Sequence, residues 1–142
     1  MSAILLDTGP LVALLDRRDR FHQWAVAQWA ELSPPLLSCE PVLAEACFLV
    51  RNLPGGPTSV LELVDRGVLS VPFRLDANVP AVQRLLMRYA SVPMSLADAC
   101  LVRMAEQVSR SRVLTLDRDF LLYRVHGRQM VPAVMPAERR RP

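Results

Sequence analysis

Short apolar runs alternate with segments of helical periodicity along most of the chain. Runs bounded by polar or turn residues predict strands at 2–6, 36–38, 68–71 and 112–116, and a last edge strand at 130–131. Apolar positions spaced three or four residues apart predict helices at 10–15, 21–32, 41–51, 58–66, 76–89, 95–108 and 120–124. Strands and helices in alternation are typical of a parallel sheet covered by helices, so the pattern predicts an α/β fold.

Two of these helices carry more specific expectations. Asp76 is placed to cap the helix over 76–89, whose inward positions are Val79, Val82, Leu85, Leu86 and Tyr89. In the helix over 21–32, Phe21, Trp24 and Trp29 lie on one face, which predicts core packing; the alternative is a groove for a partner helix. The stretch 52–57, with two Pro and two Gly, is expected to be a loop.

The composition describes one domain of moderate size. A chain of 142 residues, 51% hydrophobic and 22% charged, can bury a substantial core but does not hold a second full domain. We expect a single domain over 1–137 and a disordered basic tail over 138–142. All seventeen basic residues are Arg, which excludes Schiff-base chemistry and the lysine of a P-loop. The formal net charge of +3 comes largely from three Arg in the tail.

The cysteines and the N-terminus point to a reducing compartment. Cys39, Cys47 and Cys100 form no C-x-x-C pair, and an odd number argues against a closed disulfide framework. No basic segment precedes the first apolar run, and Asp7 and Asp16 interrupt the stretch that a secretory signal keeps apolar. No apolar run approaches the ~18 residues of a membrane span. We expect a cytoplasmic protein without membrane contact.

Four acidic residues lie within apolar runs and have no basic residue three or four positions away: Asp7, Glu45, Asp98 and Asp117. Local ion pairs therefore cannot neutralise them. A buried carboxylate without a partner costs several kcal/mol or takes up a proton. Asp7 and Asp117 follow predicted strands, and ligands of open α/β sheets bind in the crevice beyond the carboxyl ends of the strands. We expect these acids to meet a cation, a hydrogen-bond donor or solvent there.

If Glu45 and Asp98 open onto the same cleft, four oxygen ligands converge in it. Such a set is selected by a hard divalent cation such as Mg²⁺ or Mn²⁺, and it suits Zn²⁺ poorly. A cation in this place neutralises a phosphate and lowers the pKa of an attacking water. The residues thus favour metal-dependent phosphodiester hydrolysis without a covalent nucleophile.

The four acids sit in segments that follow one another in the order of a known family: Leu5–Asp16, Pro41–Ala46, Met94–Ala99 and Leu114–Phe120. In these segments the chain resembles the PIN-domain ribonucleases, and most closely the VapC toxins of bacterial and archaeal toxin–antitoxin pairs. The resemblance covers the chain from near its N-terminus to its last fifth. It implies a three-layer αβα sandwich with a parallel sheet of about five strands flanked by helices.

The resemblance also implies roles for individual residues. The catalytic, metal-binding acids that it implies are Asp7, Glu45, Asp98 and Asp117. Asp7 and Asp98 are the firmest metal ligands, Thr8 and Thr115 match hydroxyl positions beside the site, and Asp119 matches an acid that assists through water. Further implications are Mg²⁺ or Mn²⁺ as cofactor, RNA such as tRNA or rRNA as substrate, a homodimer, and a cognate VapB-like antitoxin that covers the site.

Each acid also has a structural alternative. Asp98 stands three residues after a serine, in the S-x-x-D pattern of a capping box. Asp7 and Asp117 could each cap the helix or turn that follows. Glu45 is harder to explain in this way, because a helix interior offers it no free backbone donor. Its rival, Glu40, precedes a proline at the helix entry.

The sequence leaves three functions open. The main hypothesis is a Mg²⁺- or Mn²⁺-dependent endoribonuclease toxin that cuts structured RNA at single-stranded nucleotides and is inhibited by an antitoxin. The alternatives are a PIN-family nuclease of RNA maturation without an antitoxin, and a non-catalytic PIN-like module that binds RNA or protein. Arginines near the cleft are expected to hold the RNA. The candidates are Arg17, Arg18, Arg20, Arg51, Arg103 and Arg118.

Overall fold

A five-stranded parallel sheet forms the centre of the protein. The structure is a computed structural model and describes residues 2–137; the predicted basic tail lies outside the described residues. The strands follow the order β3-β2-β1-β4-β7, and each neighbouring pair is parallel. They are β1 Ala3–Leu6, β2 Leu36–Leu37, β3 Leu69–Ser70, β4 Ser111–Leu114 and β7 Ala133–Val134. The predicted α/β fold with about five parallel strands is confirmed.

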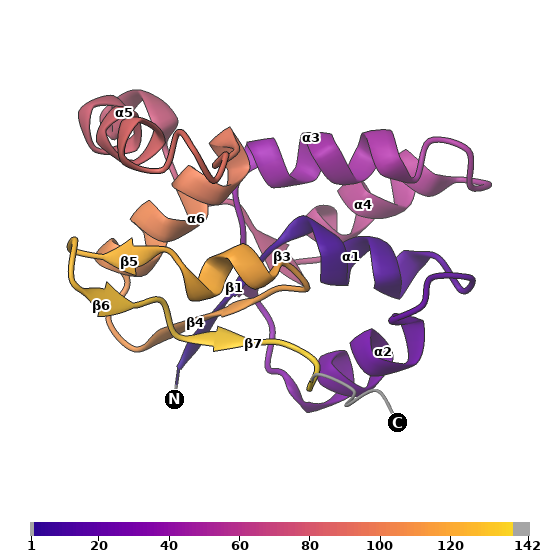
Figure 1. The fold of residues 1–142 in the computed structure, drawn as a ribbon. Coiled ribbons are helices and arrows are strands. Elements are labelled where there is room, and N and C mark those ends of the chain that lie inside the picture. Colours follow the sequence, from indigo (N-terminus) through magenta and orange to yellow (C-terminus); the bar gives the residue numbers. More distant parts are fainter. Residues whose placement is uncertain (1, 138–142) are drawn as a thin grey trace.

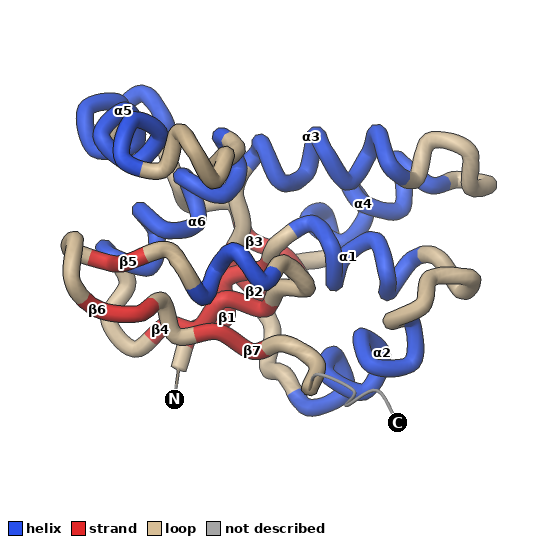
Figure 2. The backbone as a smooth tube through the Cα atoms, in the orientation of Figure 1, coloured by secondary structure: helices blue, strands red, loops and turns tan. Residues whose placement is uncertain are grey.

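Helices flank the sheet, as Figure 1 shows. They are α1 Thr8–Leu15, α2 His22–Glu31, α3 Glu40–Leu49, α4 Gly56–Asp65, α5 Val79–Arg88 and α6 Leu96–Gln107. Two short 3₁₀ helices, η1 Leu75–Ala77 and η2 Arg118–Leu121, precede α5 and follow β4. An antiparallel pair, β5 Arg124–Val125 with β6 Gln129–Met130, stands beside the main sheet (Figure 2). Within residues 2–137, no helix is both long enough and apolar enough to cross a bilayer.

The two faces of the sheet bury separate cores. Leu5 of β1 and Val113 of β4 belong to a cluster that includes apolar side chains of α5 and α6. Their neighbours Leu6 and Leu114 belong to a second cluster, with side chains of α1, α3 and α4. Successive strand residues point to opposite faces, so alternate positions of the same two strands serve both cores. This arrangement is the predicted three-layer αβα sandwich.

The edge strand predicted at 130–131 is wrong in both place and pairing. Residues Gln129–Met130 pair with β5 outside the main sheet, and the strand beside β4 is Ala133–Val134. This two-residue strand has too little apolar sequence to show periodicity. Long-range hydrogen bonds define it instead: the Val113 amide donates to the Pro132 carbonyl at 2.8 Å, and the Thr115 amide donates to the Val134 carbonyl at 3.1 Å.

Helix α5 begins later than predicted, so Asp76 is not its N-cap. Asp76 lies in η1, where it is exposed and pairs with Arg74 at 2.8 Å. Pro80 occupies the first turn of α5, a position that suits its fixed φ and missing N–H. Because the helix starts there, Val79 at its first position is 40% exposed rather than inward. The other predicted inward positions of α5 are buried or half-buried.

The stretch 52–57 is not a plain loop, because α4 begins within it at Gly56, two residues earlier than predicted. A Cβ at Gly56 would overlap the backbone carbonyl of Val50, which follows α3. Only glycine therefore allows the start of α4 to lie this close to the end of α3. The Gly56 amide also donates to the Leu53 carbonyl at 2.9 Å. The α3–α4 connection is thus fixed by packing.

Candidate active site

Asp7 and Asp117 extend from neighbouring strands at one edge of the sheet. Leu6 of β1 lies in register with Leu114 of β4, and the Asp7 amide donates to the Leu114 carbonyl at 3.0 Å. Each acid also caps the element that follows it. Asp7 accepts from the Thr8 amide at the start of α1, and Asp117 accepts from the Asp119 amide at the start of η2, which replaces the predicted helix 120–124. The capping alternatives are therefore real, but each uses one carboxylate oxygen.

Asp7 is the most deeply buried of the four predicted acids, with 7% of its surface exposed. Its Oδ2 accepts a 2.6 Å hydrogen bond from the Thr115 hydroxyl, which in turn accepts from the Asp117 amide at 2.9 Å. Burial raises the pKa of Asp7 from its ordinary value of 3.8 to about 6, although the hydrogen bonds from Thr115 and Thr8 oppose this shift. The charges of Asp98 and Asp117 add to the rise. The carboxylate is held by neutral donors only.

Asp98 opens helix α6 and faces the same region. A capping box is present: the Ser95 hydroxyl accepts from the Asp98 amide at 3.0 Å, and Asp98 Oδ2 accepts from the Ser95 amide at 3.1 Å. Burial raises the pKa of Asp98, and the nearby charge of Asp117 contributes. Within residues 2–137 the hydrogen bonds accepted by Asp98 all end on Oδ2. The cap thus orients the carboxylate and leaves Oδ1 for the site.

Tyr123 completes the support of Asp98. Its side chain is fully buried, and its hydroxyl donates to Asp98 Oδ2 at 3.1 Å. Burial and the adjacent charge of Asp98 raise the pKa of Tyr123, so the hydroxyl keeps its proton at neutral pH. The rings of Tyr89 and Phe120 meet that of Tyr123 edge-on, each with centroids 5.1 Å away, and fix its position. The sequence did not indicate Tyr123, because its apolar neighbours are typical of a packing position. Its contact with Asp98 arises only when the chain folds.

Glu45 is exposed and so reaches solvent directly. It lies on the outer part of α3, and its Oε2 accepts from the Thr8 hydroxyl at 3.2 Å. Thr8 therefore joins two acids, because its amide donates to Asp7 while its hydroxyl donates to Glu45. Glu45 therefore meets a side-chain donor from α1 and solvent, two of the partners that were expected for an acid within an apolar run.

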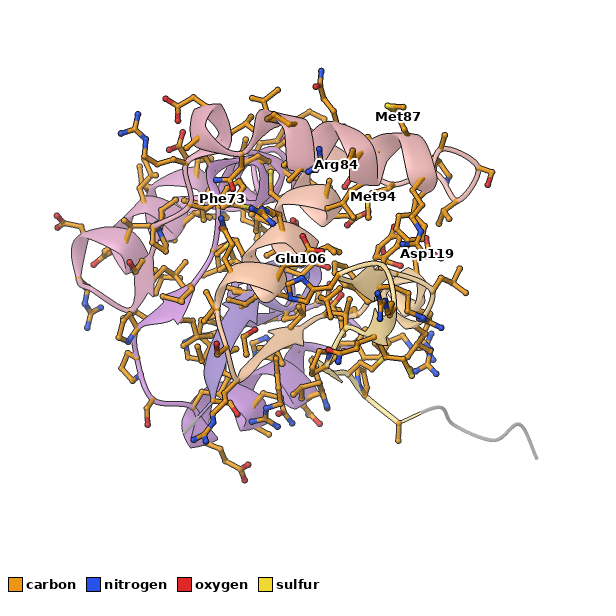
Figure 3. All side chains as sticks on the ribbon, turned by 90° about the vertical axis from the view of Figure 1, so that its left-hand side faces the viewer. Phe73, Arg84, Met87, Met94, Glu106 and Asp119 are labelled. Atoms are coloured by element: carbon orange, nitrogen blue, oxygen red, sulfur yellow. The ribbon has the colours of Figure 1, made fainter. Side chains whose placement is uncertain are left out.

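The hydrogen bonds connect the acids into one chain: Glu45, Thr8, Asp7, Thr115, Asp117 and Asp119. Asp119 comes from η2 and is labelled in Figure 3. It is half-buried, and its charge is felt at the Tyr123 hydroxyl. Asp98 is outside this hydrogen-bonded chain, but its charge acts on Asp7. The seven predicted site residues thus come from the ends of β1 and β4, the first turns of α1, α6 and η2, and the middle of α3.

Gly9 permits the close approach of α1 to the loop that carries Asp117. A Cβ at Gly9 would stand 3.1 Å from the Cβ of Leu116, closer than packed side chains normally come. A larger residue in the Asp7-Thr8-Gly9-Pro10 segment would push Leu116 away and displace Asp117 beside it. The glycine therefore belongs to the construction of the site.

The donor set suits a hard divalent cation. Within residues 2–137, none of the ion pairs involves Asp7 or Asp98, so their buried charge is uncompensated by arginine. No group of three or more acidic, His or Cys side chains in that part of the chain stands close enough to enclose a metal ion. The arrangement agrees with Mg²⁺, which takes oxygen ligands, keeps several waters and binds through one or two carboxylates plus phosphate.

A search among curated proteins found no significant match. Among solved structures, the chain is similar to a crystal structure of VapC20 from Mycobacterium tuberculosis, which is described as a sarcin-ricin loop cleaving toxin. The TM-score is 0.70 and the sequence identity 22%, with 82% of this chain and 92% of the other covered. At this identity the likeness concerns the fold.

The sequence profile of the PIN domain matches residues 4–125. The matched segment begins in β1 and ends in β5, and it contains every predicted site residue. Family profile, strand order and acid placement agree. The chain belongs to the PIN domain family.

Proposed function

We propose that the protein is a divalent-metal-dependent endoribonuclease of the toxin type, which hydrolyses phosphodiester bonds of RNA. One observation carries the proposal: Asp7 and Asp98 are buried close enough to each other and to Asp117 for their charges to interact, and burial, with this repulsion, raises the pKa of Asp7. Such charge is costly unless a cation binds. Membership of the PIN domain family and the fold shared with a sarcin-ricin loop cleaving toxin support this function.

Asp7 and Asp98 would hold the metal directly, and Glu45 and Asp117 would act on it through bound water, because no three described acidic side chains stand close enough for joint direct ligation. Mg²⁺ or Mn²⁺, when bound, supplies neutralisation of the phosphate and a lowered pKa for the attacking water. Thr8 donates to both Asp7 and Glu45 and so keeps their carboxylates oriented.

Support for the other side of the site comes from three residues. Thr115 fixes Asp7 through its hydroxyl and Asp117 through that acid's amide. Tyr123 fixes Asp98. Asp119 is placed to orient a water beside Asp117. The Asp117 carboxylate accepts a hydrogen bond from the Asp119 amide. In-line attack on a phosphate requires such fixed oxygens, because a misplaced ligand lowers the rate steeply.

Two partners belong to the proposal. A cognate VapB-like antitoxin would cover the acid site, and a second copy of the chain would form a homodimer. Exposed apolar side chains on α3 and α4 support an interface: Phe48 is 60% exposed, Leu49 51% and Leu61 58%. Met87 of α5, 77% exposed, also points away from the body of the protein (Figure 3).

The direct test is sequencing of RNA 5′ ends after induced expression, with tRNA and rRNA as the expected targets. The parent protein should create new ends at one or a few sites, and Asp98→Asn should not. Asp65→Asn is the matched control, because Asp65 is exposed at the end of α4. If Asp98→Asn cleaves as fast as the parent with Mg²⁺, the enzyme assignment is wrong. A toxin is expected to have an adjacent gene for a small DNA-binding protein that suppresses the cleavage. If no such protein suppresses it, a PIN nuclease of RNA maturation would be favoured instead.

A further inference from the structure

A pocket of about 840 Å³ opens beside the acid site, on the side of the molecule where α2 lies near the end of the described chain (Figure 1). The start of α2 supplies Arg20, Phe21 and Trp24 to its wall. The loop after β4 supplies Leu116 and Arg118. Pro136 and Ala137, at the end of the described chain, complete the lining. The pocket therefore joins three segments that are distant in the sequence, and we call it the arginine pocket.

The lining chemistry is cationic and aromatic. Two guanidinium groups reach the arginine pocket, and no described lining residue is acidic. The guanidinium of Arg20 lies over the Phe21 ring, 5.1 Å from its centroid, which keeps the charge near the pocket mouth. Trp24 is half-buried, so its ring is held by the core while part of it faces the pocket. Arginine with an adjacent fixed indole ring is typical of sites for single-stranded nucleic acid.

A second pocket gives a useful contrast. It has a volume of about 630 Å³ and lies between α3 and η1. Its lining carries Glu40 and Asp76 as well as Arg74, and Arg74 is already paired with Asp76. The second pocket thus carries two acids beside its one arginine, whereas no described lining residue of the arginine pocket is acidic.

The position of the arginine pocket ties it to the acids. Leu116 and Arg118 are the two residues that flank Asp117, so the same loop presents an acid to the site and a cation to the pocket. Leu116 also packs against Gly9 of α1, two residues from Asp7. If one phosphate of an RNA strand lies at the acids, a neighbouring nucleotide of that RNA would cross this loop and lie at the arginine pocket.

We infer that the arginine pocket binds an unpaired nucleotide of the substrate RNA next to the cleaved phosphate. Arg20 and Arg118 contact phosphate oxygens, and the base stacks on Trp24. The inference rests on the proposed function and adds to it a binding site for the nucleotide beside the cut, on residues outside the acid site. A paired base could not reach the indole, because its faces are covered by neighbours in the helix.

Fluorescence offers a direct test, because Trp24 and Trp29 are the two tryptophans of the chain and only Trp24 lines the arginine pocket. The probe is a 12-nucleotide single-stranded RNA of mixed sequence, titrated with Mg²⁺ into Asp98→Asn protein to prevent cleavage. The Trp29→Phe protein, in which Trp24 is the sole fluorophore, should lose emission on titration. The Trp24→Phe protein should lose little, since Trp29 lies outside the pocket. Equal quenching of both would overturn the inference.

Binding constants give a second readout that does not depend on the fluorophores. Trp24→Leu should weaken RNA binding roughly tenfold, and Trp29→Leu, its matched control on the same helix, should not. Arg20→Gln should lower the slope of log Kd against log salt by about one, while Arg84→Gln, on the exposed face of α5 and outside the pocket lining, should leave that slope unchanged. Thermal melting of each variant checks that the fold is kept.

The outcomes separate the two proposals. If the parent cleaves cellular RNA but Trp24 and Arg20 variants bind the probe like their controls, the pocket inference is wrong and the proposed function stands. If the parent cleaves no RNA, the proposed function fails, and the titration still decides whether the pocket binds single-stranded RNA. Quenching of Trp24 by an acidic peptide but not by RNA would overturn the inference and assign the pocket to a protein partner.

Discussion

The loop Leu116–Arg118 separates two regions that hold charge in opposite ways. On one side, Asp7 and Asp98 are buried and receive hydrogen bonds only from neutral groups. On the other side, Arg20 and Arg118 line an open pocket with aromatic rings. The acids lose solvation energy on folding, whereas the exposed Arg20 keeps its contact with water. The acid region is thus destabilised by its own charge, and the pocket is not.

This difference indicates what each region requires from outside the chain. Elsewhere within residues 2–137, acids and arginines pair with one another, as in Arg103 with Glu106 at 3.3 Å. Asp7 and Asp98 have no such partner in that part of the chain, so a cation has to be supplied. Two arginines line the pocket, and no described residue of its lining is acidic. In the proposed function, one RNA strand would place a phosphate at the acids and a neighbouring nucleotide in the pocket.

The largest expected effect comes from removing one charge of the acid region. Asp7→Asn should lower the rate of RNA cleavage on the order of 10³-fold with Mg²⁺ present, because the site loses its most buried ligand charge. Asp65→Asn makes the same chemical change on an exposed helix end and should leave the rate unchanged. A time course on total RNA measures both. Similar loss in the two variants would mean that the acid region has no special role.

The next effect concerns stability without metal and depends on pH. The pKa of Asp7 is about 6 in the folded protein against 3.8 ordinarily, so the folded state binds this proton more tightly. Stability therefore falls as pH rises from about 4 to about 6, and above pH 6 the charge costs about 3 kcal/mol. Asp7→Asn should be more stable than the parent by roughly this amount near pH 8 and nearly equal to it near pH 4.

Urea unfolding with EDTA measures this difference at the two pH values. Asp65→Asn serves again as the control, since its exposed carboxylate is solvated in both states. A stability difference between Asp7→Asn and the parent that does not change with pH would show that burial of the charge is not the cause. The charge of the acid region would then cost no folding free energy, as is the case for the solvated charge of the pocket.

Metal binding should relieve the same repulsion. Millimolar Mg²⁺ or Mn²⁺ should raise the melting temperature by roughly 5 °C, as expected if its concentration is about ten times the Kd. The rise should be absent in Asp98→Asn and kept in Arg20→Gln, because only the first variant changes the acid region. An unchanged melting temperature in the parent would argue against a preformed metal site.

Local sequence was enough to find the acids but not their surroundings. Asp7 and Asp117 could be placed at one sheet edge because the apolar strands before them are buried, and parallel neighbours end together. Glu45 could be expected to meet a donor or solvent, but its actual donor, the Thr8 hydroxyl, depends on how α1 packs beside α3. Asp76 failed as a cap because a proline four residues later sets where α5 starts.

Contacts between distant segments could not be predicted. The arginine pocket joins α2 to the loop after β4, and nothing in either segment alone indicates the other. Tyr123 is 25 residues from Asp98, and its hydroxyl reaches the carboxylate only after α6 packs against the sheet. Periodicity identifies a buried face, but it does not identify which polar tip on that face meets which partner.

The smallest predicted effect tests whether neutral donors organise the acid region. Tyr123→Phe removes the hydroxyl that holds Asp98 and should lower cleavage roughly tenfold, with about 1 kcal/mol less stability. Tyr89→Phe is the matched control: its ring touches that of Tyr123, but its hydroxyl accepts from the Arg124 amide and not from an acid. Tyr123→Phe should also need more Mg²⁺ for half-maximal rate, and Tyr89→Phe should not, because only the first frees the Asp98 carboxylate to turn. Equal Mg²⁺ requirements would reduce Tyr123 to a packing residue.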